Sequence, residues 1–328
     1  MYRGVTEIGE VREYLSGSQI IAFDFETAPD EPYRNEERAA LDAHKSDVVG
    51  VSFSNAEGSG IYVPLRHRIG KNADPTEVWT LFAEFAADYN VIKAAHNIAF
   101  ESMFLYKHGI VIQEPVYDTI AAAQMSLKSN TGFRTLADSG LKTLVPELLG
   151  SELPSFGEVT GGRHFDELDP SDVETVRYAC ADSDYTLRLY HLFNGWFDKW
   201  LPKHRDIVER VESPTAVYCG LMKYNGLLVD TERMKTRAAE CEGKLSKLRE
   251  DIAFIIGDVN IGANASTSAF KEYLYKDLGL PVLKTTANYQ EAADDEVMIL
   301  LAEWCEKNRP DLVPLFRLIQ DYRRWGKM

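Results

Sequence analysis

Strand-like and helix-like segments alternate along the first 200 residues of this chain, and only helix-like segments follow. The run IIAFDFET, which begins at Ile20, alternates as a strand does, and VVGVSFSN, SGIYVPL and VIKAAHN predict further strands. Helical spacing appears between and after them, as in PTEVWTLFAEFAADY. We therefore expect an α/β domain over residues 1–200 and a smaller, mostly helical region over residues 201–328, with a boundary near Trp200.

The charge balance limits how the chain meets other molecules. It has 51 acidic against 36 basic residues, a formal net charge of −15. That charge opposes non-specific attraction to a polyanion, although an enzyme that binds metal ions through carboxylates gains positive charge from the metals. No apolar run approaches the roughly 20 residues of a membrane span. The acidic N-terminus is unlike a signal peptide, so we expect a cytoplasmic protein with no membrane partner.

An acidic pair interrupts the apolar strand that begins at Ile20. Asp24 and Glu26 are two residues apart and project from one face, while Phe23 and Phe25 project from the other. Buried like charges at this spacing repel, so the pair needs a cation or a protonated member. A solvent-facing strand edge is the alternative, but the surrounding apolar residues favour a central strand. The pair therefore predicts a cation site.

Two further pairs lie on predicted helices. Asn97 and Glu101 are four residues apart, as are Tyr178 and Asp182, and this spacing places each pair on one helix face. Taken alone, a polar pair on a helix is more often a surface feature. The helical acids Glu101 and Asp182 can join Asp24 and Glu26 in one cluster.

In chain order these pairs read D-x-E, N-x-x-x-E and Y-x-x-x-D. The order and spacing resemble the three exonuclease motifs of the proofreading domain of family A DNA polymerases, members of the DEDDy group of 3′→5′ exonucleases. The segments AHNIAFESMFL, YDTIAAAQMSL and YACADSDYTLRLY are similar to that domain, and ESPTAVYCGLMKYNGLLVD and LFRLIQDYRRWGKM to the chain that leads into the polymerase thumb. The resemblance implies an RNase H-like domain, a mixed sheet flanked by helices, followed by thumb-like helices.

The resemblance also implies a two-metal-ion mechanism with Mg²⁺ or Mn²⁺, which hydrolyses single-stranded DNA from its 3′ end to 5′-mononucleotides. Asp24, Glu26 and Asp182 would hold the ion that activates water. Asp24 would also reach a second ion with Glu101, and the Tyr178 hydroxyl would orient the attacking water. Carboxylates are the hard oxygen ligands that these ions prefer.

Three neighbouring polar residues complete the expected site. Thr27 and Asn97 match positions that contact the 3′-terminal nucleotides in the family. His96 is interpreted as a packing or hydrogen-bonding residue, because Tyr178 matches the position where a related group of exonucleases has His.

Three departures from the family matter, and two alternative functions remain open. Glu101 stands where the family has Asp, one methylene shorter, so a weakly active or silent domain that binds DNA or acts as a scaffold in a replication complex is one alternative. An RNA-trimming exonuclease of the same group would share the four acids. The stretch from Ser266 to Phe270 lacks the Gln of the S-x-x-Q-L turn, and no palm or finger motif follows, so we expect no DNA synthesis from this chain alone.

The last predicted helix carries an apolar stripe that the family would cover with the polymerase. Its members are Leu312, Leu315, Leu318, Ile319 and Trp325. We expect this stripe to dock onto a separate polymerase polypeptide or onto another copy of the chain, and a chain cut near Trp200 to keep its nuclease activity. The basic cluster Arg323, Arg324 and Lys327 either meets a DNA backbone or is a solvated helix end.

Overall fold

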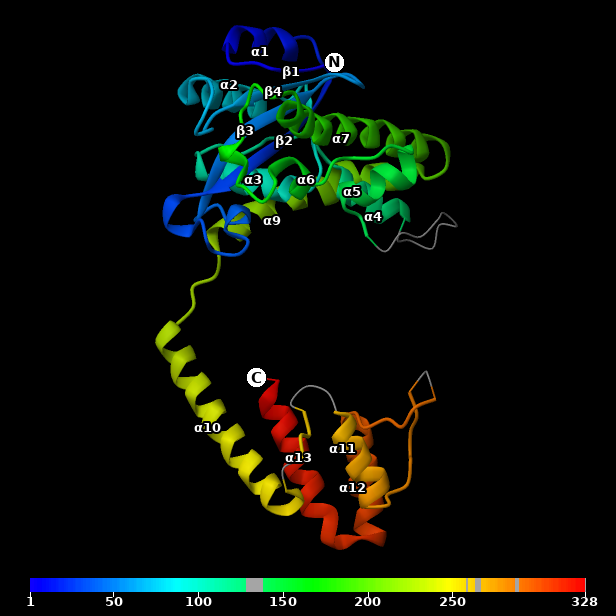
Figure 1. Ribbon diagram of the computed structural model, residues 1–328. Helices are drawn as coiled ribbons and strands as arrows, with labels where there is room; N and C mark the ends of the chain where they lie inside the picture. Colours follow the sequence, from blue (N-terminus) through cyan, green and yellow to red (C-terminus); the bar gives the residue numbers. More distant parts are fainter. Residues whose placement is uncertain (128–137, 258, 263–266, 287–288, 328) are drawn as a thin grey trace. The chain divides into compact units, whose positions relative to one another are not determined.

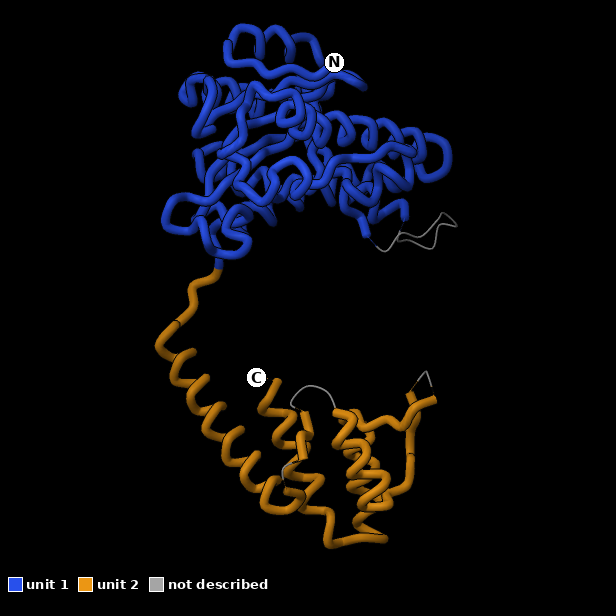
Figure 2. The backbone as a smooth tube through the Cα atoms, viewed as in Figure 1, with its two compact units in different colours: residues 1–226 blue, residues 227–328 orange. Residues whose placement is uncertain are grey.

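A computed structural model describes residues 1–127, 138–257, 259–262, 267–286 and 289–327 (Figure 1). The chain divides into two compact units, residues 1–226 and residues 227–328 (Figure 2). Each unit has a hydrophobic core of its own. Among the described helices none is long and apolar enough to cross a membrane.

The described residues of the first unit form one six-stranded sheet in the order β1-β4-β3-β2-β5-β6. The central strand β2 (Ile20–Pro29) pairs antiparallel with β3 (Ser46–Ser54) and parallel with β5 (Ile92–Ala95). The other strands are β1 (Tyr2–Gly4), β4 (Gly60–Pro64) and β6 (Val116–Asp118). The mixed sheet agrees with the prediction. The sequence pattern missed β1 and β6, because three residues are too few to show a period.

Helices cover both faces of this sheet (Figure 1). They are α1 (Ile8–Leu15), α2 (Pro75–Ala87), α3 (Ile98–Lys107), α4 (Thr119–Leu127), α5 (Leu141–Leu144), α6 (Phe156–Thr160), α7 (Val173–Lys199), α8 (Pro202–Ile207) and α9 (Ser213–Asn225). Short 3-10 and π segments are η1 (Glu31–Tyr33), η2 (Ala39–Leu41), η3 (Val145–Leu149), η4 (Phe165–Glu167) and η5 (Val208–Glu212).

The two faces of β2 have different neighbours. Phe23 and Phe25 pack with Phe82 of α2, at ring-centroid distances of 5.3 and 5.4 Å. The opposite face carries Asp24 and Glu26 and packs against α7. The predicted alternation therefore places the apolar side chains in a core and the acidic pair under a helix.

The boundary between the units differs from the one predicted near Trp200. Residues 201–226 belong to the first unit, in which α9 packs on α3 and β6. Leu201 and Val208 are buried in the same cluster as α7, and Val217 is buried in the cluster that contains Phe23. Composition marks where strands cease, but it does not show which helices complete an existing core.

The second unit is helical. Its elements are α10 (Thr231–Ile256), α11 (Ser268–Glu272), η6 (Tyr273–Asp277), α12 (Asp295–Asn308), η7 (Pro310–Leu312) and α13 (Val313–Gly326). Thr267 caps α11 by accepting a hydrogen bond from the Phe270 amide at 3.1 Å. Ser266, the first residue of the expected S-x-x-Q-L turn, lies outside the described residues.

The predicted apolar stripe of the last helix is covered within its own unit. Leu312, Leu315 and Ile319 are buried, and Leu318 packs against the same core. The Trp325 ring lies under the Lys244 ammonium of α10, 3.9 Å from its centroid. The prediction that this stripe is free to dock was wrong, because α10 and α12 supply the partner that the sequence pattern cannot identify.

The basic cluster at the end of α13 is also engaged in the fold. Arg323 is buried and donates to the Ala293 carbonyl at 3.0 Å. Lys327 pairs with Asp295, and Arg324 pairs with Asp321. These pairs favour a structural role for the cluster over a free surface for a DNA backbone.

Candidate active site

Asp24 and Glu26 of β2 meet Asp182 of α7 at the centre of the first unit. One carboxylate oxygen from each lies within 4.8 Å of the other two. No other such group of three metal-ligating side chains occurs among the described residues. The structure therefore brings together three of the four acids that the motif spacing singled out.

The surroundings of these carboxylates oppose their ionisation. Burial, and then the charge of Asp182, raise the pKa of Asp24 well above its usual value. Burial, followed by the charges of Asp24 and Asp182, does the same for Glu26. Burial also raises the pKa of Asp182. A group of acids held in this way is suited to a bound cation, which removes both penalties.

Glu101 is buried in α3, only 2% exposed. Its pKa is raised well above the usual value by burial and then by the charge of Asp24, so the two carboxyls interact. Oε2 of Glu101 has no hydrogen-bond partner among the described residues. A buried carboxylate oxygen of this kind is costly unless a ligand satisfies it.

Tyr178 lies one helical turn before Asp182 on α7 and is buried. Its ring packs against Phe165, at a centroid distance of 5.8 Å, and Phe156, at 6.3 Å. Burial, and then the charges of Glu26 and Asp182, raise the pKa of the hydroxyl far above its usual value. The phenol therefore stays protonated beside the carboxylates.

Asn97 and His96 lie where β5 leads into α3. Asn97 has a left-handed backbone (φ 75°) and is exposed, and its backbone N–H donates to Oδ1 of Asp118 at 3.0 Å. Nδ1 of His96 lies 2.8 Å from the Thr119 hydroxyl, and burial lowers the pKa of His96 to about 4. These contacts confirm the hydrogen-bonding role that we predicted for His96.

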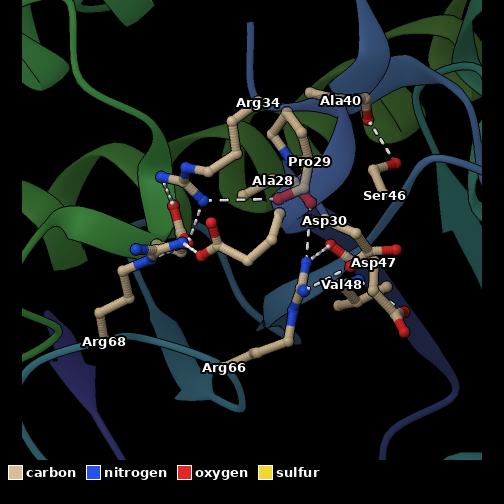
Figure 3. A network of polar contacts seen from close by, with 12 residues as sticks. Ala28, Pro29, Asp30, Arg34, Ala40, Ser46, Asp47, Val48, Arg66 and Arg68 are labelled. Atoms are coloured by element: carbon tan, nitrogen blue, oxygen red, sulfur yellow. Dashed lines mark hydrogen bonds and ion pairs between the residues drawn. The ribbon is translucent and has the colours of Figure 1, made fainter.

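A β-bulge separates Glu26 from Thr27 in the pairing of β2 with β3. Beyond it, the Thr27 hydroxyl donates to the Ala40 carbonyl at 2.7 Å. The Ser46 hydroxyl donates to the same carbonyl at 3.1 Å (Figure 3). Thr27 is thus tied to the segment that follows the acidic strand.

Three arginines fix this segment at the end of β2 (Figure 3). Arg34 donates to both oxygens of the Asp166 carboxylate at 2.8 and 3.0 Å, and Arg68 donates to Oδ2 of the same carboxylate at 2.8 Å. Arg66 donates to Asp30 at 2.7 Å. Bidentate pairs of this geometry hold a segment more firmly than single surface pairs, so the chain next to the carboxylates is well anchored.

Sequence reasoning missed Lys142 of α5. Its Nζ donates to Oδ1 of Asp182 at 2.6 Å and lies 4.8 Å from the centroid of the Tyr178 ring. A single lysine in a four-residue helix carries no periodic signal. Only the tertiary fold reveals that it belongs to the site.

The sequence matches the 3′–5′ exonuclease family of A-type DNA polymerases over residues 3–195. The chain belongs to this family. The DNA polymerase I of Pseudomonas aeruginosa is 27% identical over 322 residues, which are 96% of this chain and 32% of that protein. The DNA polymerase I of Chloroflexus aurantiacus is 28% identical over 257 residues, 76% of this chain and 25% of that protein.

The chain therefore spans about a third or less of the length of these relatives. Among solved structures, it is similar to the POL domain of Pol1 from M. smegmatis in complex with a DNA primer-template and dNTP. The TM-score is 0.72 at 18% identity, over 98% of this chain and 48% of that one. This likeness supports the fold of both units: an RNase H-like exonuclease domain followed by a helical C-terminal region.

Proposed function

We propose that this member of the 3′–5′ exonuclease family hydrolyses single-stranded DNA from its 3′ end to 5′-mononucleotides, in the DEDDy manner, with two divalent ions. The observation that carries the proposal is the group formed by Asp24, Glu26 and Asp182, whose oxygens lie within 4.8 Å of one another. A phosphodiester is a poor electrophile, so its hydrolysis needs the concentrated positive charge that such a group collects.

The residues present fit two ions of the Mg²⁺ or Mn²⁺ class. Asp24, Glu26 and Asp182 would hold one ion, and Asp24 with Glu101 the other. The buried Oε2 of Glu101, which has no hydrogen-bond partner within the described part of the chain, supports the second position, since these ions prefer hard oxygen ligands. When bound, the ions would supply an activated water and neutralise charge on the phosphoryl oxygens.

Side chains of the protein would bind the DNA strand and orient the attacking water. The protonated Tyr178 hydroxyl, held beside Glu26 and Asp182, would donate a hydrogen bond that orients the attacking water; it would not act as a base. Asn97, exposed at the start of α3, and Thr27, at the end of the acidic strand, would contact the terminal nucleotides.

Incubation with end-labelled single-stranded DNA tests this function, in Mg²⁺, in Mn²⁺ and in chelator. We expect stepwise shortening from the 3′ end with either ion and none in chelator, and a blocked 3′ end should stop it. Nicking of a circular strand, or digestion that survives the chelator, would overturn the proposal. An RNA strand of the same sequence distinguishes a DNA exonuclease from an RNA-trimming one, and absence of hydrolysis with retained DNA binding would favour a silent domain.

We also infer that the chain works together with a polymerase polypeptide. Its relatives are DNA polymerases of which it spans about a third or less. Tyr218 and Met222, four residues apart on α9, are 65% and 70% exposed, and they are the residues that the test changes. Light scattering with a family A polymerase lacking its own exonuclease domain should show a complex that is weakened by Tyr218→Ser with Met222→Ser. Assembly of the chain with itself alone, or no assembly, would contradict this partner.

A further inference from the structure

Lys142 contacts the cluster of three carboxylates that Asp24, Glu26 and Asp182 form, here called the carboxylate cluster. Its Nζ lies 2.6 Å from Oδ1 of Asp182 and 4.8 Å from the centroid of the Tyr178 ring. The Lys142 side chain is 40% exposed, whereas that of Asp182 is 13% exposed. The ammonium is therefore not a packed core group. It is a half-exposed charge in contact with a mostly buried one.

The positive charge of Lys142 affects all three acids of the carboxylate cluster. It opposes the rise in pKa of Asp24, of Glu26 and of Asp182, although among the described residues it donates a hydrogen bond to Asp182 alone. Three acids that repel one another in a buried place are stabilised by one cation at that distance. Lys142 thus supplies, in the absence of an ion, part of the charge that an ion would supply.

An ammonium and a divalent ion bound to the same carboxylate repel each other, since both are cations. Asp182 is the residue on which the two meet, because its Oδ1 accepts from Lys142 and one of its carboxylate oxygens belongs to the metal-ligating group. The four-carbon stem of a lysine lets its ammonium leave without movement of the backbone. A phosphodiester bound at the site would be the nearest new anion for it.

We propose that Lys142 is a positioning residue that exchanges with the divalent ion: its ammonium holds Asp182 while no ion is bound, the ion displaces it, and it then pairs with a phosphate oxygen of the bound strand. This inference rests on the proposed function, because it takes the carboxylate cluster as the metal site.

The test compares the full chain with Lys142→Met, which removes the charge and keeps the length, and with Lys142→Arg, which keeps the charge. Lys71→Met is the control, since Lys71 pairs with Glu7 on the surface. The melting temperature of Lys142→Met should fall in chelator and return to the wild-type value in saturating Mn²⁺. Its Mn²⁺ dissociation constant, measured by electron paramagnetic resonance, should be lower by roughly tenfold, because no ammonium competes.

The phosphate contact is measured separately, by fluorescence anisotropy with a short single-stranded oligonucleotide. In Ca²⁺ the affinity of Lys142→Met should fall by roughly tenfold, while Lys142→Arg and Lys71→Met stay near wild type. An equal loss of melting temperature in chelator and in Mn²⁺ would mean a merely structural lysine. An unchanged Mn²⁺ affinity or an unchanged oligonucleotide affinity would also overturn the inference. If the wild-type chain itself binds no Mn²⁺, the metal site of the proposed function fails instead.

Discussion

Gly220 of α9 lies directly against the backbone of Ala99 in α3. A Cβ atom at position 220 would come within 2.3 Å of the Ala99 carbonyl oxygen and within 2.9 Å of the Ser102 Cβ. The helix that carries Glu101 is therefore supported by a segment well beyond the end of the last exonuclease motif. We therefore expect the placement of Glu101 to depend on that contact.

The first prediction concerns this contact. Gly220→Ala should destabilise the protein by about 1–3 kcal/mol, because the clash is with backbone, which cannot rotate away. Gly195→Ala is the control, since Gly195 lies within α7 with open space around its Cβ position and should gain up to about 1 kcal/mol of helix propensity. Denaturant unfolding of both variants measures the difference. Equal effects would show that the close approach is unimportant.

The second prediction replaces the cut near Trp200 that the sequence suggested. A chain of residues 1–226 should unfold cooperatively and keep nuclease activity on short single strands. A chain of residues 1–200 should lose both, because it exposes the cores that Leu201, Val208 and Val217 fill. Circular dichroism melts measure the cooperativity of unfolding, and the end-labelled DNA assay measures the nuclease activity. Full activity in the shorter chain would refute the role assigned to α9.

The third prediction separates catalysis from stability. Asp24→Asn should lower the rate of hydrolysis by several orders of magnitude, since it removes a proposed ligand of the ions. In chelator the same variant should melt at a higher temperature than wild type, because one buried like charge is gone. Asp206→Asn, a change at an exposed surface pair, should alter neither quantity. A rate within a few-fold of wild type would remove Asp24 from the site.

The fourth prediction concerns Glu101. Its longer side chain should fit the strict octahedral demand of Mg²⁺ less well than the more tolerant Mn²⁺, so Mn²⁺ should give the faster hydrolysis. Glu101→Asp should keep or raise the activity in Mg²⁺, whereas Glu101→Ala should nearly abolish it. Single-turnover rates in the two metals measure this. Equal rates for all three proteins would show that Glu101 is not a ligand.

The fifth prediction concerns pH. Burial lowers the pKa of His96 from its ordinary 6.5 to about 4, so the folded protein keeps this ring neutral while the unfolded chain protonates it. The resulting stability is fully present above pH 6.5 and is lost as the pH falls through 4, a total of about 3 kcal/mol. His96→Gln should therefore lose less stability between pH 7 and 4.5 in urea unfolding. The exposed His191→Gln should follow wild type, and parallel curves for all three would contradict the shift.

Local patterns predicted the parts of the site that local geometry determines. The period of two along β2 places Asp24 and Glu26 on one face, and the period of 3.6 aligns Tyr178 with Asp182. The packing of α7 on β2 is a tertiary contact, and only the resemblance to the family predicted it. Lys142 had no such signal.

The errors share a physical cause. Amphipathicity shows that a helix has an apolar side, but not what covers it: for Ile319 the cover is its own unit, and for Val217 it is the exonuclease core. The domain boundary was misplaced for the same reason. A change in secondary structure type is visible in the sequence, whereas membership of a core is not.

Two alanines on the acidic face of β2 belong to the same buried clusters as residues of α7. Ala22 and Ala28 flank Asp24 and Glu26, and both are fully buried, in the clusters that also contain Leu187 and Ala179 of α7. Their small side chains allow the helix to pack close to the strand. The separation between Asp182 and its partners is thus sensitive to side-chain volume, so in the proposed metal site a single added methyl group beneath α7 would alter the choice of ion without changing any ligand.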